Sequence, residues 1–492
     1  MTETTRTALL LCGDWRLSVR LADWSPDGDV EVHVVPGLCG QLETIGRVLT
    51  GKGFHRLVLG LCSEEYSVAE MQTQARKLGL DALGVEIVHL RDVEVEKAKV
   101  LLTAAVARAR VFAGSRPEHA KLYLSSRISR RSLLRLSITE YMAAPSIDHG
   151  LCAADIGCSV CAQVCPQNAL EWADGRMHYD KEKCEPCGLC VTSCPRGAVL
   201  NPACTPAQLE AQVRTLLSVQ YRGPRGILFL CQRSPEPGGI DGWMPVRLPC
   251  VGMATPTWLL APLLMGAGSV TVVPCGEACP AHQADAVEEK VAFCRQYLRM
   301  IGAPEDLVTL SPAPDESPRH GGDGVSPENP FSHRAGADVL LSLAQAYGVT
   351  HGVLEHPAAP VGSVEIRAEA CTACGMCARS CPTEALTFGE GEEGVTLNFD
   401  ASRCVACSQC LPKCPEMERG AITLHRMVDL ERLDQGRTLL YGEETARCVV
   451  CGAAIAPLKM VKRVEELLGT DYAAMMPLLT QYCMDCRVTS QG

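Results

Sequence analysis

One cysteine pattern occurs four times in the chain, and this repeat constrains the fold more than any other feature of the sequence. Residues 371–382 have the spacing C-x2-C-x2-C-x3-C-P. Residues 184–195 and 404–415 repeat this spacing, and residues 158–166 form a fourth copy that lacks its first cysteine. This is the ligand spacing of paired [4Fe–4S] clusters, in which the fourth cysteine of each run binds the other cluster. The four runs therefore predict two pairs of clusters.

The two complete runs near the C-terminus predict a dicluster ferredoxin domain over residues 364–425. By the spacing rule, Cys371, Cys374, Cys377 and Cys414 hold one cluster, and Cys404, Cys407, Cys410 and Cys381 hold the other. Glycine lacks a Cβ, so Gly375 lets the backbone approach the first cluster, as Gly188 does in the earlier domain. Ser408 and Ser159 replace that glycine in the other two copies, and we expect their loops to differ.

Residues 151–205 predict another dicluster ferredoxin domain, in which one ligand is uncertain. One cluster takes Cys184, Cys187, Cys190 and Cys165, and the other takes Cys158, Cys161 and Cys194. The fourth ligand of the second cluster is either Asp155, at the first position of the motif, or Cys152, slightly upstream. We favour Cys152 because thiolates suit iron–sulfur clusters better than carboxylates do. An Asp-Gly pair within residues 172–178 predicts a β-hairpin in this domain.

Residues 1–115 alternate short apolar strands with amphipathic helices, which predicts an α/β domain with a mostly parallel sheet. Its cysteines, Cys12, Cys39 and Cys62, lie at or just after the expected strand ends. Open α/β sheets bind ligands at such ends. The three residues are therefore either ligands of a cluster or small buried apolar side chains, and the spacing alone does not decide between these alternatives.

Residues 206–312 show the same alternation and predict a second α/β domain. Cys231, Cys250 and Cys275 end three successive expected strands, and Cys279 follows shortly afterwards. A parallel sheet would gather these four thiols at one edge, where they suit a [2Fe–2S] cluster. The alternative is a set of unconnected core cysteines.

Two segments join these domains. Residues 116–150 form a basic connector in which Arg127, Arg130, Arg131 and Arg135 lie near one face of an expected solvated helix. Residues 313–363 form a linker followed by a helix, and the linker is rich in Pro, Gly and Ser, a composition that favours disorder.

The C-terminal segment, residues 440–492, carries two C-x2-C pairs on either side of an expected helix. The pairs are Cys448 with Cys451 and Cys483 with Cys486. Four thiolates in two such pairs predict a structural zinc site in a zinc-ribbon-like domain. An iron ion is the alternative occupant.

The composition limits the remaining choices. The chain has 29 cysteines, 4% aromatic residues and a net charge of -11, and a net negative charge argues against a nucleic-acid partner. The sequence shows no signal peptide at its beginning, no apolar run of roughly 18 residues and no G-x-G-x-x-G fingerprint for a flavin or a nicotinamide. We therefore expect a cytoplasmic, multidomain α/β and α+β protein without direct membrane insertion, flavin or NAD.

Several stretches resemble known families. Residues 34–39, 56–62, 86–91 and 96–99 resemble the N-terminal region of the heterodisulfide reductase A subunit. Residues 227–231, 247–252 and 266–279 resemble the delta subunit of methyl-viologen-reducing hydrogenases, although Ser234 stands where those proteins usually have a second cysteine. The resemblance implies an electron-transfer subunit of a heterodisulfide-reductase-like or related flavin-linked complex.

Three functions are compatible with these patterns. The first is a multi-cluster electron conduit whose partners are a flavoprotein, hydrogenase, dehydrogenase or heterodisulfide-reductase-like catalytic subunit. The second is an enzyme with its own substrate, for which the sequence offers no convincing catalytic residue. The third is a structural or redox-sensing protein that uses its clusters as staples. The number and pairing of the clusters favour the electron conduit.

Overall fold

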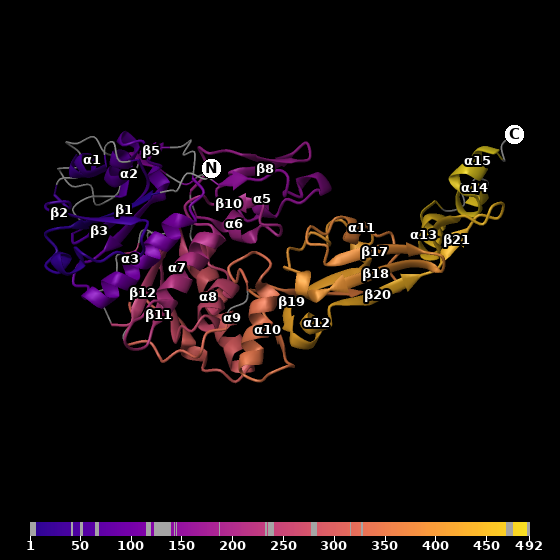
Figure 1. The fold of residues 1–492 in the computed structure, drawn as a ribbon. Helices are drawn as coiled ribbons and strands as arrows, with labels where there is room; N and C mark the ends of the chain where they lie inside the picture. The colour runs from indigo at the N-terminus through magenta and orange to yellow at the C-terminus, as the bar shows by residue number, and fades with distance from the viewer. Residues whose placement is uncertain are drawn as a thin grey trace.

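The computed structural model describes an elongated molecule (Figure 1). The described residues are 6–40, 43–49, 53–63, 68–114, 120–122, 139–141, 143, 145–185, 187–231, 234, 241–276, 283–314, 316–325, 328–468 and 476–489. The four arginines predicted on a helix of the basic connector lie outside these ranges. Among the described helices, none has both the length and the apolar character that a membrane crossing requires.

The first α/β unit contains a four-stranded parallel sheet in the order β2-β1-β3-β4. Its strands are β1 (Arg6–Cys12), β2 (Val30–Val35), β3 (Phe54–Leu61) and β4 (Val85–His89). Its helices are α1 (Glu43–Leu49), α2 (Val68–Lys77) and α3 (Val95–Arg110). Along β1, Ala8 and Leu10 belong to the core that includes Ile45 of α1, whereas Leu9 and Leu11 belong to the core under α3. Both faces of the sheet are therefore covered, as parallel sheets require.

The second α/β unit has the same arrangement. Its parallel sheet has the order β12-β11-β13-β14. Its strands are β11 (Gly226–Cys231), β12 (Trp243–Leu248), β13 (Ser269–Val273) and β14 (Val308–Leu310), and its helices are α7 (Pro206–Ser218), α8 (Pro256–Leu264) and α9 (Ala284–Met300). The start of α7 is set by a capping box, in which Thr205 and Gln208 bond reciprocally and Pro206 occupies the first turn.

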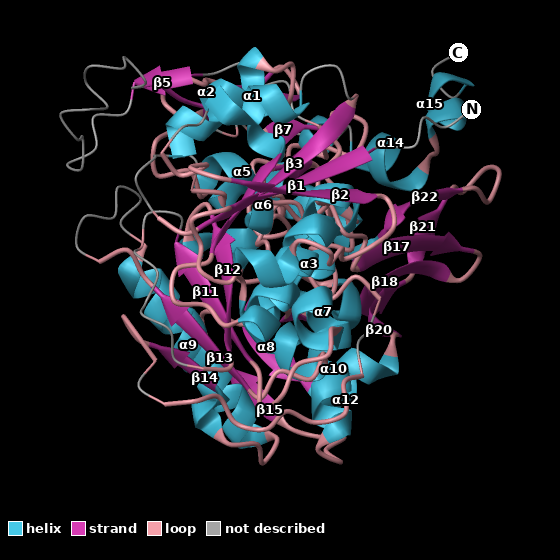
Figure 2. Ribbon diagram, turned by 60° about the vertical axis from the view of Figure 1, so that its left-hand side comes forward, coloured by secondary structure: helices cyan, strands magenta, loops and turns pink. Residues whose placement is uncertain are grey.

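The two α/β units pack against each other through α3 and α7, which lie side by side in Figures 1 and 2. At this contact Arg108 is buried and donates hydrogen bonds in three directions. Its partners are Glu86 (3.0 Å), Gln212 (2.7 Å) and the carbonyl oxygen of Ala203 (2.7 Å). Because a buried charge is tolerated only when it is paired, this network fixes the orientation of the two units.

The first ferredoxin domain lies beside both α/β units. Its elements are β7 (Ser146–Ile147), α5 (Val160–Gln163), β8 (Leu170–Ala173), β9 (Arg176–Tyr179), α6 (Leu189–Ser193) and β10 (Val199–Leu200). The predicted hairpin is confirmed, since β8 and β9 pair antiparallel around Asp174 (φ 51°) and Gly175 (φ 71°). Strands β7 and β10 pair to close the domain.

The second ferredoxin domain extends away from the α/β units toward the C-terminus (Figure 1). Helix α10 (Gly336–Ala346) leads into it. Its strands are β15 (Val353–Glu355), β16 (Gly362–Ile366), β17 (Leu386–Gly391), β18 (Gly394–Asp400), β19 (Ile422–Asp429) and β20 (Arg437–Glu443), and its helices are α11 (Met376–Arg379) and α12 (Leu430–Gln435). The tail contains β21 (Thr445–Arg447), β22 (Ala454–Pro457), α13 (Leu458–Leu468), α14 (Met476–Gln481) and α15 (Met484–Thr489).

The proline- and glycine-rich segment before α10 packs against the second α/β unit. Phe331 is fully buried, and its carbonyl oxygen accepts a hydrogen bond from the indole of Trp258 (2.9 Å). The indole of Trp243 donates to the carbonyl oxygen of Glu316 (2.8 Å), and the backbone of Arg319 donates to Ser269 (3.2 Å). The expectation of a disordered linker is therefore wrong for the described residues of this segment.

Candidate iron–sulfur centres

The first cysteine loop of the second ferredoxin twice enters the left-handed region of backbone conformation. Ala373 has φ 53° and Gly375 has φ 72°. The N–H of Ala373 donates to the sulfur of Cys371 (3.4 Å), and α11 begins directly after Gly375, so Cys377 lies in its first turn. A loop of this shape directs successive cysteines toward one cavity.

That cavity defines a group that we call centre four. The four sulfur ligands predicted from the spacing line it: Cys371, Cys374, Cys377 and Cys414. Apolar side chains complete the wall, among them Ile366, Phe388 and Leu397. Gly375 is in close contact with this wall, because a Cβ at its position would meet the ring of Phe388 at 2.9 Å. The residues present therefore suit a cluster bound by four thiolates in an apolar pocket.

The other copy in this domain forms centre three, which comprises Cys381, Cys404, Cys407 and Cys410. Its loop repeats the first one, with Ala406 at φ 49° and Ser408 at φ 61°. The expectation that serine changes this loop is therefore wrong for Ser408. Burial, with a contribution from neighbouring thiolates including Cys381, raises the pKa of Cys404 to about 12 and that of Cys407 to about 11. Without metal these thiols are protonated, so cluster insertion must release protons.

Centre one lies in the first ferredoxin and contains its complete set of predicted ligands. Cys165, Cys184, Cys187 and Cys190 line one cavity, together with Leu170, Tyr179 and Val191. Gly188 has φ 74°, which matches Gly375 in the second ferredoxin. The fourth cysteine of the incomplete run thus meets the first three of the complete run, as the exchange of ligands between paired clusters requires.

Centre two comprises Cys158, Cys161, Cys194 and Cys152. Burial, together with the charges of Cys194, Cys158 and Cys152, raises the pKa of Cys161 to about 12, which places Cys152 close to the set. Asp155 is exposed on the short 3-10 helix Ala154–Ile156, and Trp172 fixes this helix by donating to the carbonyl oxygen of Ala154 (2.8 Å). This placement favours Cys152 over Asp155 as the fourth ligand.

The loop of the incomplete run differs from the other three, as expected for Ser159. Ser159 has φ -134°, outside the left-handed region that Gly188 and Ser408 occupy. Gly157 (φ 83°), the residue before Cys158, is left-handed like Ala373 and Ala406 at the equivalent position, so the incomplete run lacks only the second left-handed residue. The backbone of the incomplete run therefore departs from the other loops at Ser159.

The centres of the two ferredoxins are adjacent to other cysteine sites. Cys187 of centre one packs against Cys250 of the second α/β unit in one buried cluster. The charge of Cys158 in centre two contributes to the raised pKa of Cys407 in centre three, after burial and Cys381. A Cβ at Gly157 would also clash with the ammonium group of Lys413, so the two ferredoxins are in contact there.

The strand-end cysteines of the second α/β unit lie where the sequence predicts them. Cys231 ends β11, and Cys250 and Cys275 follow β12 and β13. The sulfur of Cys250 accepts a hydrogen bond from the N–H of Gly252 (3.3 Å). Cys279, the fourth predicted ligand, lies outside the described residues.

Lys290 lies near Cys250 and was not identified from the sequence. Burial lowers the pKa of Lys290 to about 8, an effect that the nearby Cys250 opposes, and its ammonium donates to the carbonyl oxygen of Gly252 (2.5 Å). A sequence signal exists, because Lys290 lies three residues after Val287 and next to Val291 on the buried face of α9. A charged residue on such a face suggests a nearby opposite charge.

The three cysteines of the first α/β unit also come together. The sulfur of Cys62 lies 3.4 Å from that of Cys12 and 3.7 Å from that of Cys39. Hydrogen bonds, mainly from the Cys39 thiol and also from the Cys62 thiol, lower the pKa of Cys12 to about 5 against the opposing effect of burial. The three thiols therefore lie close enough together to bind one metal site, and whether they do so stays a prediction.

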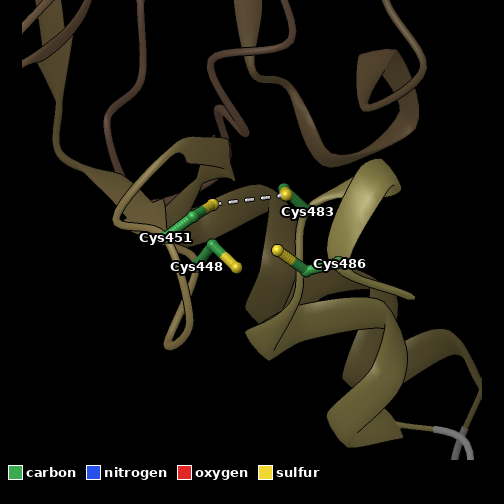
Figure 3. Close-up of side chains that lie close together, drawn as sticks. All are labelled: Cys448, Cys451, Cys483 and Cys486. Atoms are coloured by element: carbon green, nitrogen blue, oxygen red, sulfur yellow. Dashed lines mark hydrogen bonds between the residues drawn. The ribbon is translucent and has the colours of Figure 1, made fainter. Parts of the chain in front are cut away.

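The tail cysteines form a compact four-sulfur site (Figure 3). The sulfurs of Cys448, Cys451, Cys483 and Cys486 all lie within 4.8 Å of one another, and those of Cys451 and Cys483 are 3.6 Å apart. Zn–S bonds of about 2.3 Å in a tetrahedron place two sulfurs about 3.8 Å apart. The four thiols therefore fit a structural zinc ion, although the occupant remains a prediction.

Comparison with known proteins identifies the two ferredoxin domains. Residues 156–198 and 370–417 match the family model described as "4Fe-4S dicluster domain". The chain is 33% identical over 82 residues to formate hydrogenlyase subunit 2 of Escherichia coli (17% of this chain and 38% of the relative). It is 51% identical over 43 residues to a formate dehydrogenase iron-sulfur subunit of Wolinella succinogenes (8% and 22%). It is 41% identical over 44 residues to one of the subunits of the ion-translocating oxidoreductase complex of Methanosarcina acetivorans (9% and 17%).

These similarities have a limited extent. The chain spans between 17% and 38% of the length of these three relatives. The matches show dicluster ferredoxin domains that bind [4Fe–4S] clusters and transfer electrons, within a mixed α/β chain that has parallel sheets. The predicted likeness to heterodisulfide reductase A and hydrogenase delta subunits stays a prediction.

Proposed function

We propose that this chain is the multi-cluster electron-transfer subunit of a heterodisulfide-reductase-like oxidoreductase complex. Its centres take one electron at a time from one neighbour and pass it to the next, without making or breaking a covalent bond. The partners are a flavoprotein and a hydrogenase, dehydrogenase or heterodisulfide-reductase-like catalytic subunit. The multi-subunit assemblies named for two of the relatives support a subunit role of this kind.

The observation that supports this proposal best is the continuity of the centres. The [2Fe–2S] site proposed at Cys231, Cys250, Cys275 and Cys279 meets centre one through the contact of Cys250 with Cys187. Centres one and two share the first ferredoxin, and centre two lies near centre three, since Gly157 is in contact with Lys413 and the charge of Cys158 acts on Cys407. Centres three and four share the second ferredoxin. A protein that used clusters only as staples would not need this ordered series.

The central position of centre two provides the test. A tagged full-length chain is purified anaerobically with its native partners, and electron flow from the donor to the acceptor of the complex is measured. We expect Cys161→Ala to remove one cluster and to reduce electron flow at least tenfold, because the series is interrupted. Cys294→Ala is the matched control, since this buried cysteine lies on α9 outside the proposed centres.

Reductive titration of the same preparations provides a second measurement. Several one-electron centres should appear in the wild-type chain, and their EPR signals should broaden through coupling between adjacent clusters. A redox-silent wild-type chain would contradict the proposal. Undiminished electron flow in Cys161→Ala, with centre two absent, would show that the proposed series is not the route.

A further inference from the structure

The two α/β units have the same topology and carry cysteines at equivalent positions. In each unit the first strand is central, the second strand lies on one side of it, and the third and fourth lie on the other. Cys12 ends β1 as Cys231 ends β11, and Cys39 follows β2 as Cys250 follows β12. Cys62 follows β3 as Cys275 follows β13. The strand order changes direction at the first strand of each sheet. Open α/β sheets bind ligands beyond the carboxyl ends of their strands at such a point.

The sulfur distances in the first unit indicate which kind of metal it suits. The Cys62 sulfur is 3.4 Å from Cys12 and 3.7 Å from Cys39, and all three sulfurs lie within 4.8 Å of one another. These separations are close to the value of about 3.8 Å for two thiolates on one tetrahedral ion. They also resemble the 3.6 Å separation in the tail site.

The ferredoxin centres show how cysteines are spaced around an iron–sulfur cluster in the same chain. All of their cysteines belong to the described residues, and within those residues the only groups with three or more ligand atoms this close are the tail site and Cys12, Cys39 and Cys62. The corners of a cubane hold their sulfurs farther apart, because each thiolate binds a different iron. The three thiols of the first unit therefore match a single ion and do not match a cubane.

The described side chains supply three ligands to this site, one fewer than a tetrahedral ion takes. Among the described residues, no further His, Cys, Asp or Glu ligand atom joins the three sulfurs. The N–H of Cys62 donates to the Cys39 sulfur (3.3 Å), a bond that stabilises a bound thiolate. The hydroxyl oxygen of Ser63, the residue after Cys62, is buried and has no hydrogen-bond partner in the described structure. The Ser63 hydroxyl is therefore available to donate a hydrogen bond to a further ligand of the ion, such as water.

We propose that Cys12, Cys39 and Cys62 bind one tetrahedral, thiophilic divalent cation, with zinc as the expected occupant and a solvent molecule as the fourth ligand. Three protein ligands and one exchangeable position distinguish this site from the closed four-thiolate site in the tail. The first unit would then be a copy of the second in which the strand-end cysteines hold an ion that does not change its oxidation state.

Metal analysis of the full chain tests this site. Zinc, iron and acid-labile sulfide are measured after anaerobic purification in the wild type and in Cys39→Ser, Cys62→Ser, Cys448→Ser and the double variant Cys39→Ser/Cys448→Ser. We expect two zinc ions in the wild type, one in each single variant and none in the double variant, with iron and sulfide unchanged. Cys294→Ser is the control that should keep both ions.

The other outcomes separate this proposal from that for the tail. Loss of iron together with sulfide in Cys39→Ser would show that the site holds an iron–sulfur cluster and would overturn the proposal of a single ion. An unchanged zinc content in both Cys39→Ser and Cys62→Ser, or a disulfide between Cys12 and Cys62 in the purified protein, would also overturn it. If only the prediction of zinc in the tail is wrong, Cys448→Ser will keep the zinc content of the wild type while Cys39→Ser still loses zinc.

Cadmium substitution keeps the proposal testable if a serine variant does not fold. Full-length wild-type protein is exchanged with ¹¹³Cd²⁺ and examined by NMR. Two resonances are expected, one for a four-sulfur site and one shifted to lower frequency because an oxygen ligand replaces a sulfur. A single four-sulfur resonance would contradict the three-thiolate site.

Discussion

The two ferredoxin domains use the same cysteine spacing in different surroundings. The first is enclosed by its neighbours, since Cys187 packs on Cys250, Gly188 faces Met253, and Gly197 packs against His333. The second extends away from the α/β units and carries the sheet of β17, β18 and β20 on one side (Figure 1). The same ligand loop is therefore compatible with a central and a peripheral position.

The domains also differ in how faithfully they follow the motif. Both loops of the second ferredoxin place two residues in the left-handed region at equivalent positions, whereas the incomplete run of the first places Gly157 there and leaves Ser159 outside it. That run has Asp155 where the other runs have their first cysteine, and Cys152 is near enough for its charge to act on Cys161 and Cys158. The comparison favours Cys152 as the substitute for the missing ligand, in a run whose backbone departs from the others at Ser159.

The largest expected effect concerns this replaced ligand. We expect Cys152→Ala to lose the cluster of centre two, whereas Asp155→Ala should retain it, because Asp155 is exposed. In the second ferredoxin, Cys371→Ala should lose centre four to the same extent. Iron and sulfide content with EPR spectra measures all three variants. If Asp155→Ala loses the cluster and Cys152→Ala retains it, the ligand assignment is reversed.

The second prediction compares the two glycines that approach the clusters. Gly188→Ala and Gly375→Ala both place an L-residue in the left-handed region, at a cost of about 1–2 kcal/mol. The new Cβ of Gly375→Ala would also meet the ring of Phe388, whereas that of Gly188→Ala would meet the sulfur of Met253, at 2.8 Å. A methionine side chain adapts more easily than a ring. We therefore expect the larger loss of stability for Gly375→Ala.

Denaturant titration followed by cluster absorbance measures this difference. Ala373→Gly is the matched control, because Ala373 already has a positive φ and glycine should be tolerated there. Equal losses in Gly188→Ala and Gly375→Ala would show that backbone strain outweighs the two side-chain contacts.

The third prediction concerns the enclosure of the first ferredoxin and its pH dependence. Burial lowers the pKa of His333, partly offset by a hydrogen bond with the backbone of Thr192. The unfolded chain therefore binds a proton near pH 6.5 that the folded chain binds only at lower pH. The stability that neutral His333 contributes is present above pH 6.5 and is lost as the pH falls toward the lowered pKa.

Urea unfolding between pH 5 and pH 8 tests this dependence. We expect His333→Gln to show a weaker loss of stability below about pH 6.5 than the wild type, because glutamine does not titrate. His351→Gln is the control, since His351 is exposed on the connection between α10 and β15. If the free energy of unfolding of His333→Gln falls with decreasing pH as steeply as that of the wild type, the pH dependence comes from other groups.

The sequence predicted the local features of the centres because these depend on residues near one another in the chain. The C-x2-C-x2-C-x3-C spacing fixes each ligand loop, and the strand-end positions of Cys12, Cys39 and Cys62 follow from the alternation of strands and helices. The contact between Cys187 and Cys250 could not be predicted, because it depends on how two domains dock. The packed linker was missed for a similar reason, since Phe331 is buried only when Trp258 is beside it.

The smallest expected effect concerns the two serines that replace the motif's glycine. The backbone is left-handed at Ser408 but not at Ser159. Ser408 has φ 61°, so Ser408→Gly should relieve strain and stabilise the second ferredoxin by up to about 1 kcal/mol. Ser159 has φ -134°, and its hydroxyl accepts a hydrogen bond from Gln163 (3.0 Å). Ser159→Gly should therefore destabilise the first ferredoxin by about 0.4–1 kcal/mol, because glycine adds freedom to the unfolded chain. Opposite signs in urea midpoints would support the two loop conformations, and a stabilising Ser159→Gly would show that the incomplete run follows the same course as the other three.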